Sequence, residues 1–322
     1  MRAVLVSALS GDLSGTTLAE VDEPAAAPGE ILVEVRAAAL NHPDLLMTRG
    51  SYQLKPPLPF VPGMEVAGTV LSADPASGFA TGDAVVCATR LGGLADRIAC
   101  PAEAARLLPA GLDFVHAAAA GAAYLTAYVA LVRLAAVRAG EWVLIHGASG
   151  GVGLAAVDLA KALGARVIAT SRSAAKLKVV ADRYAVDAVC PASGFRERVK
   201  DLTGGGADIV FDPVGGDTFD ESTRCIAFGG RLLVVGFTSG RIASVATNIP
   251  LIKGFSLIGV RAGEYGRRFP ARGAEDRDAV WAMIGAGRLA PHVDRTYRLS
   301  DWHEAFEAMA RGDMVGKLVI EP

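Results

Sequence analysis

The stretch WVLIHGASGGVGLAAVDLAKALGARVIATSR, residues 142–172, decides the fold of this chain. It opens with an apolar run that predicts a buried strand, followed by a glycine-rich turn and by apolar residues at helical spacing. Gly164 is suited to end the helix, and residues 166–170 predict a second strand. A strand, a glycine-rich turn, a helix and a strand in this order are typical of a dinucleotide-binding βαβ unit.

The glycines of such a turn have separate physical tasks. One permits the tight turn, one lets a pyrophosphate approach the backbone, and one lets the helix pack on the strand. Here Ala148 replaces the first glycine of the usual fingerprint, while Gly150 and Gly153 keep their register. Such a turn also occurs for steric reasons alone, so the flanking strands and helix carry the inference. We expect the phosphates to bind the free amides at the helix start, at Ser149, Gly150, Gly151 and Val152.

The end of the second strand indicates which dinucleotide binds. A site for NAD usually has an Asp or Glu there that binds the ribose hydroxyls. This chain has Ser171 and Arg172 instead, with Lys176 one turn later. Hydroxyls and cations would bind a 2′-phosphate that a carboxylate would repel, so NADPH is favoured over NADH. The alternative interpretation is that the two cations belong to a solvated helix start.

Composition bounds the class of protein. The 322 residues are 52% hydrophobic, which is enough for about two domains. Their formal charge of −2 predicts no basic surface for nucleic acid or anionic membranes. No apolar run reaches membrane-spanning length, and the N-terminal residues lack the features of a signal peptide, so we expect a cytoplasmic protein. The four cysteines form no CxxC pair and the five histidines no HExxH motif, so no metal site is expected.

The organisation changes near residue 115. Before it, short strand-like runs alternate with Pro, Gly and Asp turns, which predicts a small β-barrel. After it, an alanine-rich helical stretch leads into alternating strands and helices, which predicts an α/β doubly wound parallel sheet. The tail after residue 289 most simply completes the first domain. The expected strands of the parallel sheet are residues 142–146, 166–170, 188–190, 208–212, 231–236 and 256–260.

Several motifs in sequence order resemble the medium-chain dehydrogenase/reductase superfamily, and within it the zinc-free quinone oxidoreductases related to ζ-crystallin. The resemblance covers nearly the whole chain. It rests on AAALNHPDLLMTRGSY (37–52), PFVPGMEVAGTV (59–70), HGASGGVG (146–153), DIVFDPVGGD (208–217), GGRLLVVGF (229–237) and VGKLVI (315–320).

The resemblance implies a fold and a division of the chain. It predicts a GroES-like β-barrel catalytic domain, residues 1–118 and 264–322, and a Rossmann NADPH-binding domain, residues 119–263, with the nicotinamide in the cleft between them. It also implies a homodimer formed through the edge strand Phe255 to Val260. Aligned with zinc-dependent relatives, the chain has Asn41, Met64 and Ala122 where those enzymes have metal ligands. None is a good zinc ligand, which again predicts no metal.

The same resemblance suggests residues beside the nicotinamide. Asn41 would bond a ribose hydroxyl or the substrate oxygen, or is a turn residue before Pro43. Asp44 either belongs to the same segment or caps a helix. Tyr52 is the best candidate proton donor, with a packing role as the alternative. Thr126 aligns with a threonine that faces the nicotinamide. The catalytic candidates are therefore Tyr52, Asn41 and Thr126.

Further cofactor contacts are expected where parallel strands end, because ligands of open α/β sheets bind there. The candidates are Val214 and Gly215 after the fourth strand, and Gly236, Phe237 and Ser239 after the fifth. Lys317, in the closing VGKLVI, either reaches back to the cofactor or lies on the surface.

Without a metal to polarise an alcohol, the expected reaction is hydride transfer from NADPH to a quinone or an α,β-unsaturated carbonyl, which delocalises the incoming charge itself. An alternative is an enoyl thioester reductase acting on acyl-CoA or acyl-carrier substrates, for which Arg261, Arg267 and Arg268 would form a cationic patch. A further alternative is a crystallin-like protein that binds NADPH without turnover.

Overall fold

The computed structural model describes all 322 residues, which divide into two compact units. The first contains Met1–Ala122 and Pro291–Pro322, and the second contains Ala123–Ala290. No helix combines the length and apolar character that a membrane crossing requires.

The second unit is built on a six-stranded sheet whose neighbouring strands all run parallel. Its order is β10-β9-β8-β11-β12-β13, so the direction of winding reverses between β8 and β11. This is the doubly wound order of dinucleotide-binding folds, and it confirms the fold class predicted from the sequence. The strands are β8 (Trp142–Ile145), β9 (Arg166–Ser171), β10 (Ala188–Pro191), β11 (Ala207–Asp212), β12 (Ile226–Val234) and β13 (Ser256–Gly259).

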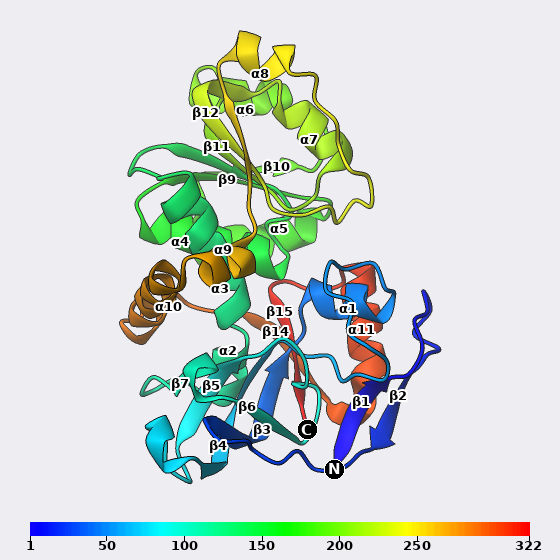
Figure 1. Ribbon diagram of the computed structural model, residues 1–322. Coiled ribbons are helices and arrows are strands. Elements are labelled where there is room, and N and C mark those ends of the chain that lie inside the picture. Colours follow the sequence, from blue (N-terminus) through cyan, green and yellow to red (C-terminus); the bar gives the residue numbers. More distant parts are fainter. The chain divides into compact units, whose positions relative to one another are not determined.

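Helices connect these strands, and Figure 1 shows them packed around the sheet. The helix predicted after the glycine-rich turn is α4 (Gly151–Ala162), which ends just before Gly164 at φ +78°. Its inward side is almost entirely Ala, Val and Leu, which allows close packing on the sheet. The others are α3 (Gly121–Tyr128, which begins in the first unit), α5 (Ala174–Tyr184), α6 (Arg196–Thr203), α7 (Gly216–Ser222), α8 (Asn248–Lys253), α9 (Ala262–Arg268) and α10 (Pro270–Gly285).

The first unit is dominated by antiparallel strands. A seven-stranded sheet runs β14-β15-β3-β4-β5-β7, with β6 also paired to β3, and a separate two-stranded sheet joins β1 to β2. The C-terminal segment belongs to this unit, in which β15 pairs with β3. The strands are β1 (Arg2–Val6), β2 (Thr16–Glu20), β3 (Glu30–Ala39), β4 (Glu65–Ala73), β5 (Ala84–Ala88), β6 (Arg97–Pro101), β7 (Ala105–Leu107), β14 (Val293–Arg298) and β15 (Lys317–Glu321).

Three helices accompany the sheets of the first unit: α1 (His42–Thr48), α2 (Phe114–Ala118) and α11 (Trp302–Arg311). Helix α11 lies beside α1 (Figure 1) and buries Trp302, Phe306 and Met309 in the same core as the inward residues of β3, β4 and β5. The C-terminal segment therefore packs directly against the segment that carries Asn41.

The division of the structure differs from the expected boundary at residue 263/264, because α9 and α10 belong to the second unit. The physical reason is a set of polar contacts that tie α10 and the segment after it to that unit. Arg133 forms an ion pair of 2.5 Å with the buried carboxylate of Asp276. The amide of Ala290 donates to Asp158 of α4 at 2.7 Å.

Candidate functional site

The glycine-rich turn is closed by one of the amides expected to bind phosphate, that of Gly150. Gly147 has φ +55°, and Gly150 donates its amide to the carbonyl of Gly147 at 2.9 Å. A Cβ on Gly153 would lie only 2.2 Å from the Gly147 carbonyl oxygen, so only glycine allows α4 to start this close to the turn. Gly150 caps α4 without a side chain, which leaves the first amides of the helix open to an anion.

The end of β9 lies against this turn. Ser149 Oγ and Ser171 Oγ are 3.1 Å apart and both side chains are buried. Ser173 caps α5 by accepting the Lys176 amide at 3.3 Å. Arg172 is exposed and forms no ion pair or hydrogen bond, so its guanidinium is available to a ligand. The structure thus brings together the residues expected to bind the pyrophosphate and those expected to bind the 2′-phosphate.

The loops after β11 and β12 pack against each other. The amide of Ser239 donates to the Val214 carbonyl at 3.0 Å, and Gly215 and Gly216 both have positive φ. A Cβ on Gly216 would lie only 2.8 Å from Ser239 Oγ, and one on Gly215 would be in tight contact with Phe237 at 3.2 Å. The five residues expected here therefore form one surface at the carboxyl end of the parallel sheet: Val214, Gly215, Gly236, Phe237 and Ser239.

Asp212 shapes the first of these loops. Its Oδ1 accepts the amides of Val214 at 2.8 Å and Gly215 at 2.9 Å. Burial raises the pKa of this carboxyl, while the two amides act in the opposite direction. The side chain is therefore a structural clamp on the loop rather than a group that faces a ligand.

In the first unit, Asn41 and Lys317 meet around Glu65. Lys317 Nζ donates to Asn41 Oδ1 at 2.6 Å and to Glu65 Oε1 at 2.7 Å. Asn41 Nδ2 also donates to Glu65 Oε1, at 2.9 Å, and the amide of Ala122 donates to Glu65 Oε2 at 2.7 Å. Lys317 is 5% exposed and Glu65 4%, so of the two placements considered for Lys317 the surface one is excluded.

Asp44 anchors the backbone of Asn41. Its Oδ2 accepts the Asn41 amide at 2.8 Å, and its Oδ1 accepts the Gly63 amide at 3.0 Å. This is the helix-capping role, and it fixes Asn41 at the start of α1. Burial raises the pKa of Asp44 to about 7, against the opposing effects of the two amides and of Lys317.

Tyr52 and Thr126 lie outside the hydrogen-bonded clusters of Glu65 and Asp44. The Tyr52 ring packs against an apolar cluster of Val6, Met47 and Phe60, which Met64 also joins. No hydrogen bond occupies the Tyr52 hydroxyl, so it is available as a donor. Thr126 lies on α3 in the second unit and is half-buried.

The three positions where zinc-dependent relatives have ligands now have assigned contacts. Asn41 and Ala122 both donate to Glu65, and Met64 packs in the apolar cluster beside Tyr52. No group of three or more His, Cys, Asp or Glu side chains is placed to hold a metal ion. An amide, a thioether and a methyl group do not form a zinc site.

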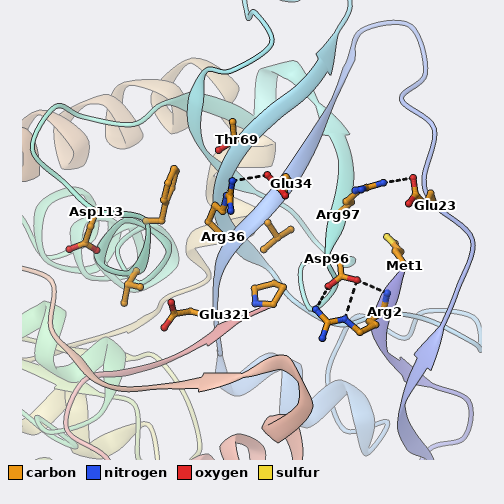
Figure 2. A pocket seen from close by; sticks show the side chains of 14 residues that line it. Met1, Arg2, Glu23, Glu34, Arg36, Thr69, Asp96, Arg97, Asp113 and Glu321 are labelled. Atoms are coloured by element: carbon orange, nitrogen blue, oxygen red, sulfur yellow. Dashed lines mark hydrogen bonds and ion pairs between the residues drawn. The ribbon is translucent and has the colours of Figure 1, made fainter.

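A hollow on the first unit does not include any of these residues (Figure 2). Its three arginines are neutralised locally: Arg2 pairs with Asp96, Arg36 with Glu34, and Arg97 with Glu23.

Sequence reasoning missed Glu65, which is the centre of the first cluster. The signal was present, because a carboxylate opens an otherwise apolar strand, EVAGTV, and a lysine opens the apolar strand KLVIE. Two opposite charges at the starts of buried strands predict a buried ion pair once the strands share a sheet.

Comparison with known proteins now identifies the family. Residues 27–110 match the alcohol dehydrogenase GroES-like domain family, and residues 151–275 match the zinc-binding dehydrogenase family. Quinone oxidoreductase-like protein 2 of Mus musculus is 34% identical over 323 residues, which is 99% of this chain and 91% of that protein. The chain belongs to the quinone oxidoreductase family of the medium-chain dehydrogenase/reductase superfamily.

Other members extend the comparison. The quinone oxidoreductase of Escherichia coli, solved in complex with NADPH, is 29% identical, with a TM-score of 0.90 and full coverage of both chains. The spectinabilin polyketide synthase system protein NorB of Streptomyces orinoci is 36% identical over 96% of this chain, which matches 14% of that much longer protein. This quinone oxidoreductase family member is thus an oxidoreductase with the GroES-like and Rossmann folds predicted from its sequence.

Proposed function

We propose that this protein transfers a hydride from NADPH to a quinone or an α,β-unsaturated carbonyl without the help of a metal ion. The observation that carries the proposal is the cluster of Asn41, Glu65 and Lys317. Asn41, at one of the three positions where zinc-dependent relatives have ligands, is bonded there to a buried ammonium group and a buried carboxylate. A metal ion is the Lewis acid that zinc-dependent relatives use to stabilise an alkoxide, whereas a quinone or enone delocalises the incoming charge itself.

The second unit fits NADPH in particular. The amides at the start of α4 are open to a pyrophosphate, and no carboxylate ends β9 where it would repel a 2′-phosphate. Arg172 is exposed and unpaired beside Ser171. The Escherichia coli relative solved with NADPH supports the same cofactor.

The hydrogen bonds of Asn41 narrow its role. Its Nδ2 donates to Glu65 Oε1 and to the Ala39 carbonyl, so both amide hydrogens are occupied. Its Oδ1 accepts one bond from Lys317 and retains a second lone pair. Asn41 can therefore accept a bond from a ribose hydroxyl, but it has no hydrogen left to donate to a substrate oxygen.

Lys317 can donate a hydrogen bond where Asn41 can only accept one. Two of its three ammonium hydrogens are used by Asn41 and Glu65, and the third is available for a hydroxyl or phosphate oxygen. Together the two residues present one acceptor and one donor to a ribose. We propose that both residues take part in cofactor binding.

NADPH supplies the hydride when it is bound, and the protein's task is to place the acceptor and manage the proton. Addition of hydride to an enone leaves a negative charge on the carbonyl oxygen, which needs a hydrogen bond or a proton. Tyr52 is the candidate donor, because its hydroxyl has no partner within the protein.

The proposal is tested by anaerobic mixing with NADPH and a panel of quinones, enals and enoyl-CoAs, followed at the nicotinamide absorbance. We expect oxidation of NADPH by quinones or enals. Binding of NADPH without reduction of any acceptor would show instead that the protein is a non-catalytic, crystallin-like binder. Oxidation by enoyl-CoAs alone would show an enoyl thioester reductase.

The thioester reductase is the second candidate, and the likeness to a polyketide synthase system protein favours keeping it in the panel. The arginines expected to bind the acyl carrier of a thioester substrate are, however, partly neutralised. Arg267 and Arg268 both pair with Glu264 on the same helix, at 3.0 Å and 2.9 Å. The paired arginines favour the small electrophile over the phosphorylated carrier.

We further propose that the protein forms a homodimer in the cytoplasm. β13 is an edge strand, and large apolar side chains surround it, with Phe228 87% and Leu251 80% exposed. Pairing with the same strand of a second copy would cover both the open edge and these side chains. Sedimentation should give a dimer that Phe228→Asp dissociates, and a monomeric wild-type protein would contradict this.

All four cysteines are unpaired, as the reducing cytoplasm favours.

A further inference from the structure

His146 is fully buried at the point where β8 enters the glycine-rich turn. Its Nδ1 lies 2.8 Å from Thr170 Oγ1, and its Nε2 lies 2.8 Å from Ser222 Oγ. Phe195 covers the ring, with the ring centroids 4.8 Å apart. The histidine therefore connects the end of β9 with helix α7 through the interior of the unit.

The directions of these hydrogen bonds follow from the partners. Ser222 Oγ donates its one hydrogen to the Thr218 carbonyl at 2.7 Å, so it must accept from His146. His146 thus carries its proton on Nε2, and its Nδ1 accepts the hydroxyl hydrogen of Thr170. Burial lowers the pKa of His146 to about 3, which keeps the ring neutral and preserves this one tautomer.

The network reaches two parts of the cofactor site without facing a ligand itself. Thr170 also accepts the Ala148 amide through its carbonyl, at 2.9 Å, so its two oxygens hold both sides of the turn. Ser149 and Ser171 are bonded one residue further along each segment. A continuous series of contacts therefore joins the phosphate-binding turn to the end of β9. It runs from His146 to Thr170, from Thr170 to Ala148, and from Ser149 to Ser171.

We propose that His146 is a positioning residue that fixes the phosphate-binding turn against the end of β9, and so determines how strongly the site prefers NADPH to NADH. The inference rests on the proposed function, because it assumes that Arg172 meets a 2′-phosphate. NADPH would place a phosphate both at the turn and at the end of β9, whereas NADH has a phosphate only at the turn and an uncharged ribose hydroxyl at the end of β9. A change in the spacing therefore weakens NADPH more than NADH.

Two conservative substitutions separate this role from general stability. His146→Asn keeps an acceptor at the position of Nδ1 and so retains the bond from Thr170. His146→Gln keeps a donor at the position of Nε2 and retains only the bond to Ser222. Thr170→Val removes the hydroxyl that joins β9 to the ring. Val143→Ala is the matched control, because it removes buried volume from the same strand and leaves the network intact.

The measurement is calorimetric titration of each folded variant with NADPH and with NADH. We expect His146→Gln and Thr170→Val to lower the ratio of the NADH Kd to the NADPH Kd about tenfold, and His146→Asn and Val143→Ala to keep it within twofold. An unchanged ratio in His146→Gln and Thr170→Val would overturn the positioning role. A wild-type protein with no preference for NADPH would instead overturn the proposed cofactor.

A measurement on the wild-type protein keeps the inference testable if the variants do not fold. Nitrogen-15 spectra of the histidine rings should show His146 as the Nε2–H tautomer and neutral down to about pH 5, as expected for a buried ring with a lowered pKa. A proton on Nδ1, or titration near the ordinary histidine value, would contradict the network.

Discussion

Lys317 Nζ lies 2.7 Å from Glu65 Oε1, and both side chains are almost completely buried. The two residues are 252 positions apart in sequence, so the pair joins the start of β15 to the start of β4. Both oxygens of Glu65 are further bonded, Oε1 by Asn41 Nδ2 and Oε2 by the Ala122 amide, and Lys317 also donates to Asn41 Oδ1. A buried pair of this kind depends strongly on both members.

Removal of one member should therefore be costly. We expect Lys317→Met and Glu65→Gln each to lower the free energy of unfolding by about 3–5 kcal/mol, because each leaves a buried polar group without its partner. The double variant should lose less than the sum of the two. Urea denaturation measures all three.

The exposed pair of Lys178 and Asp182 provides the control for this series. Lys178→Met should change the free energy of unfolding by about 1 kcal/mol or less, because solvent screens the charges. Additive losses in the double variant of the buried pair would show that Glu65 and Lys317 do not act as a unit.

Asp44 gives a pH-dependent prediction. Burial raises its pKa in the folded protein from the ordinary value of 3.8 to about 7. Among the charged groups that act on it, Lys317 lowers the pKa and Glu65 raises it. Its contribution to stability is therefore complete below about pH 4 and is lost as pH rises through about 7. Relative to Asp44→Asn, the wild-type protein should become less stable across this window. Parallel stability curves for the two proteins would refute the raised pKa.

Arg172 tests the choice of cofactor. Because its guanidinium is exposed and unpaired, we expect Arg172→Ala to raise the KM for NADPH about tenfold or more and to leave the KM for NADH nearly unchanged. Arg172→Glu should reverse the preference. Lys178→Ala, an exposed substitution on the neighbouring helix, should alter neither value. Equal KM values for the two cofactors in the wild-type protein would remove the argument from Arg172 and Lys176.

Tyr52 tests the proton donor. We expect Tyr52→Phe to lower kcat for an enal by about 100-fold, in the range of general acid catalysis, without changing the Kd for NADPH. The ring itself should still pack against Phe60 and Met47, so the melting temperature should stay the same. Full activity in Tyr52→Phe would assign this residue a packing role only.

Much of the second unit is predictable from sequence, because its strands are apolar runs separated by helices of clear period. All six strands of the parallel sheet occur within a few residues of their expected positions. The difference is in β12, which begins five residues early at Ile226 and makes an excursion around Gly229 before it regains register with β11. A local irregularity of this kind leaves no periodic signal.

The first unit and its site were less predictable. The strands β2 and β7 are short, and their largely polar or exposed residues lack the alternation that identifies a strand. The meeting of Asn41, Glu65 and Lys317 depends on sheet register between segments far apart in the chain, which no local pattern records. The contacts of His146 leave no sequence signal either, because its partners Thr170 and Ser222 belong to different βα units.

The central claim is hydride transfer from NADPH without a metal ion. It is tested most directly by single-turnover mixing of NADPH-loaded enzyme with a benzoquinone under anaerobic conditions, after dialysis against a chelator and verification by elemental analysis that zinc is absent. We predict oxidation of NADPH at a rate that added zinc does not increase. Activity that disappears with the metal and returns with stoichiometric zinc would contradict the account.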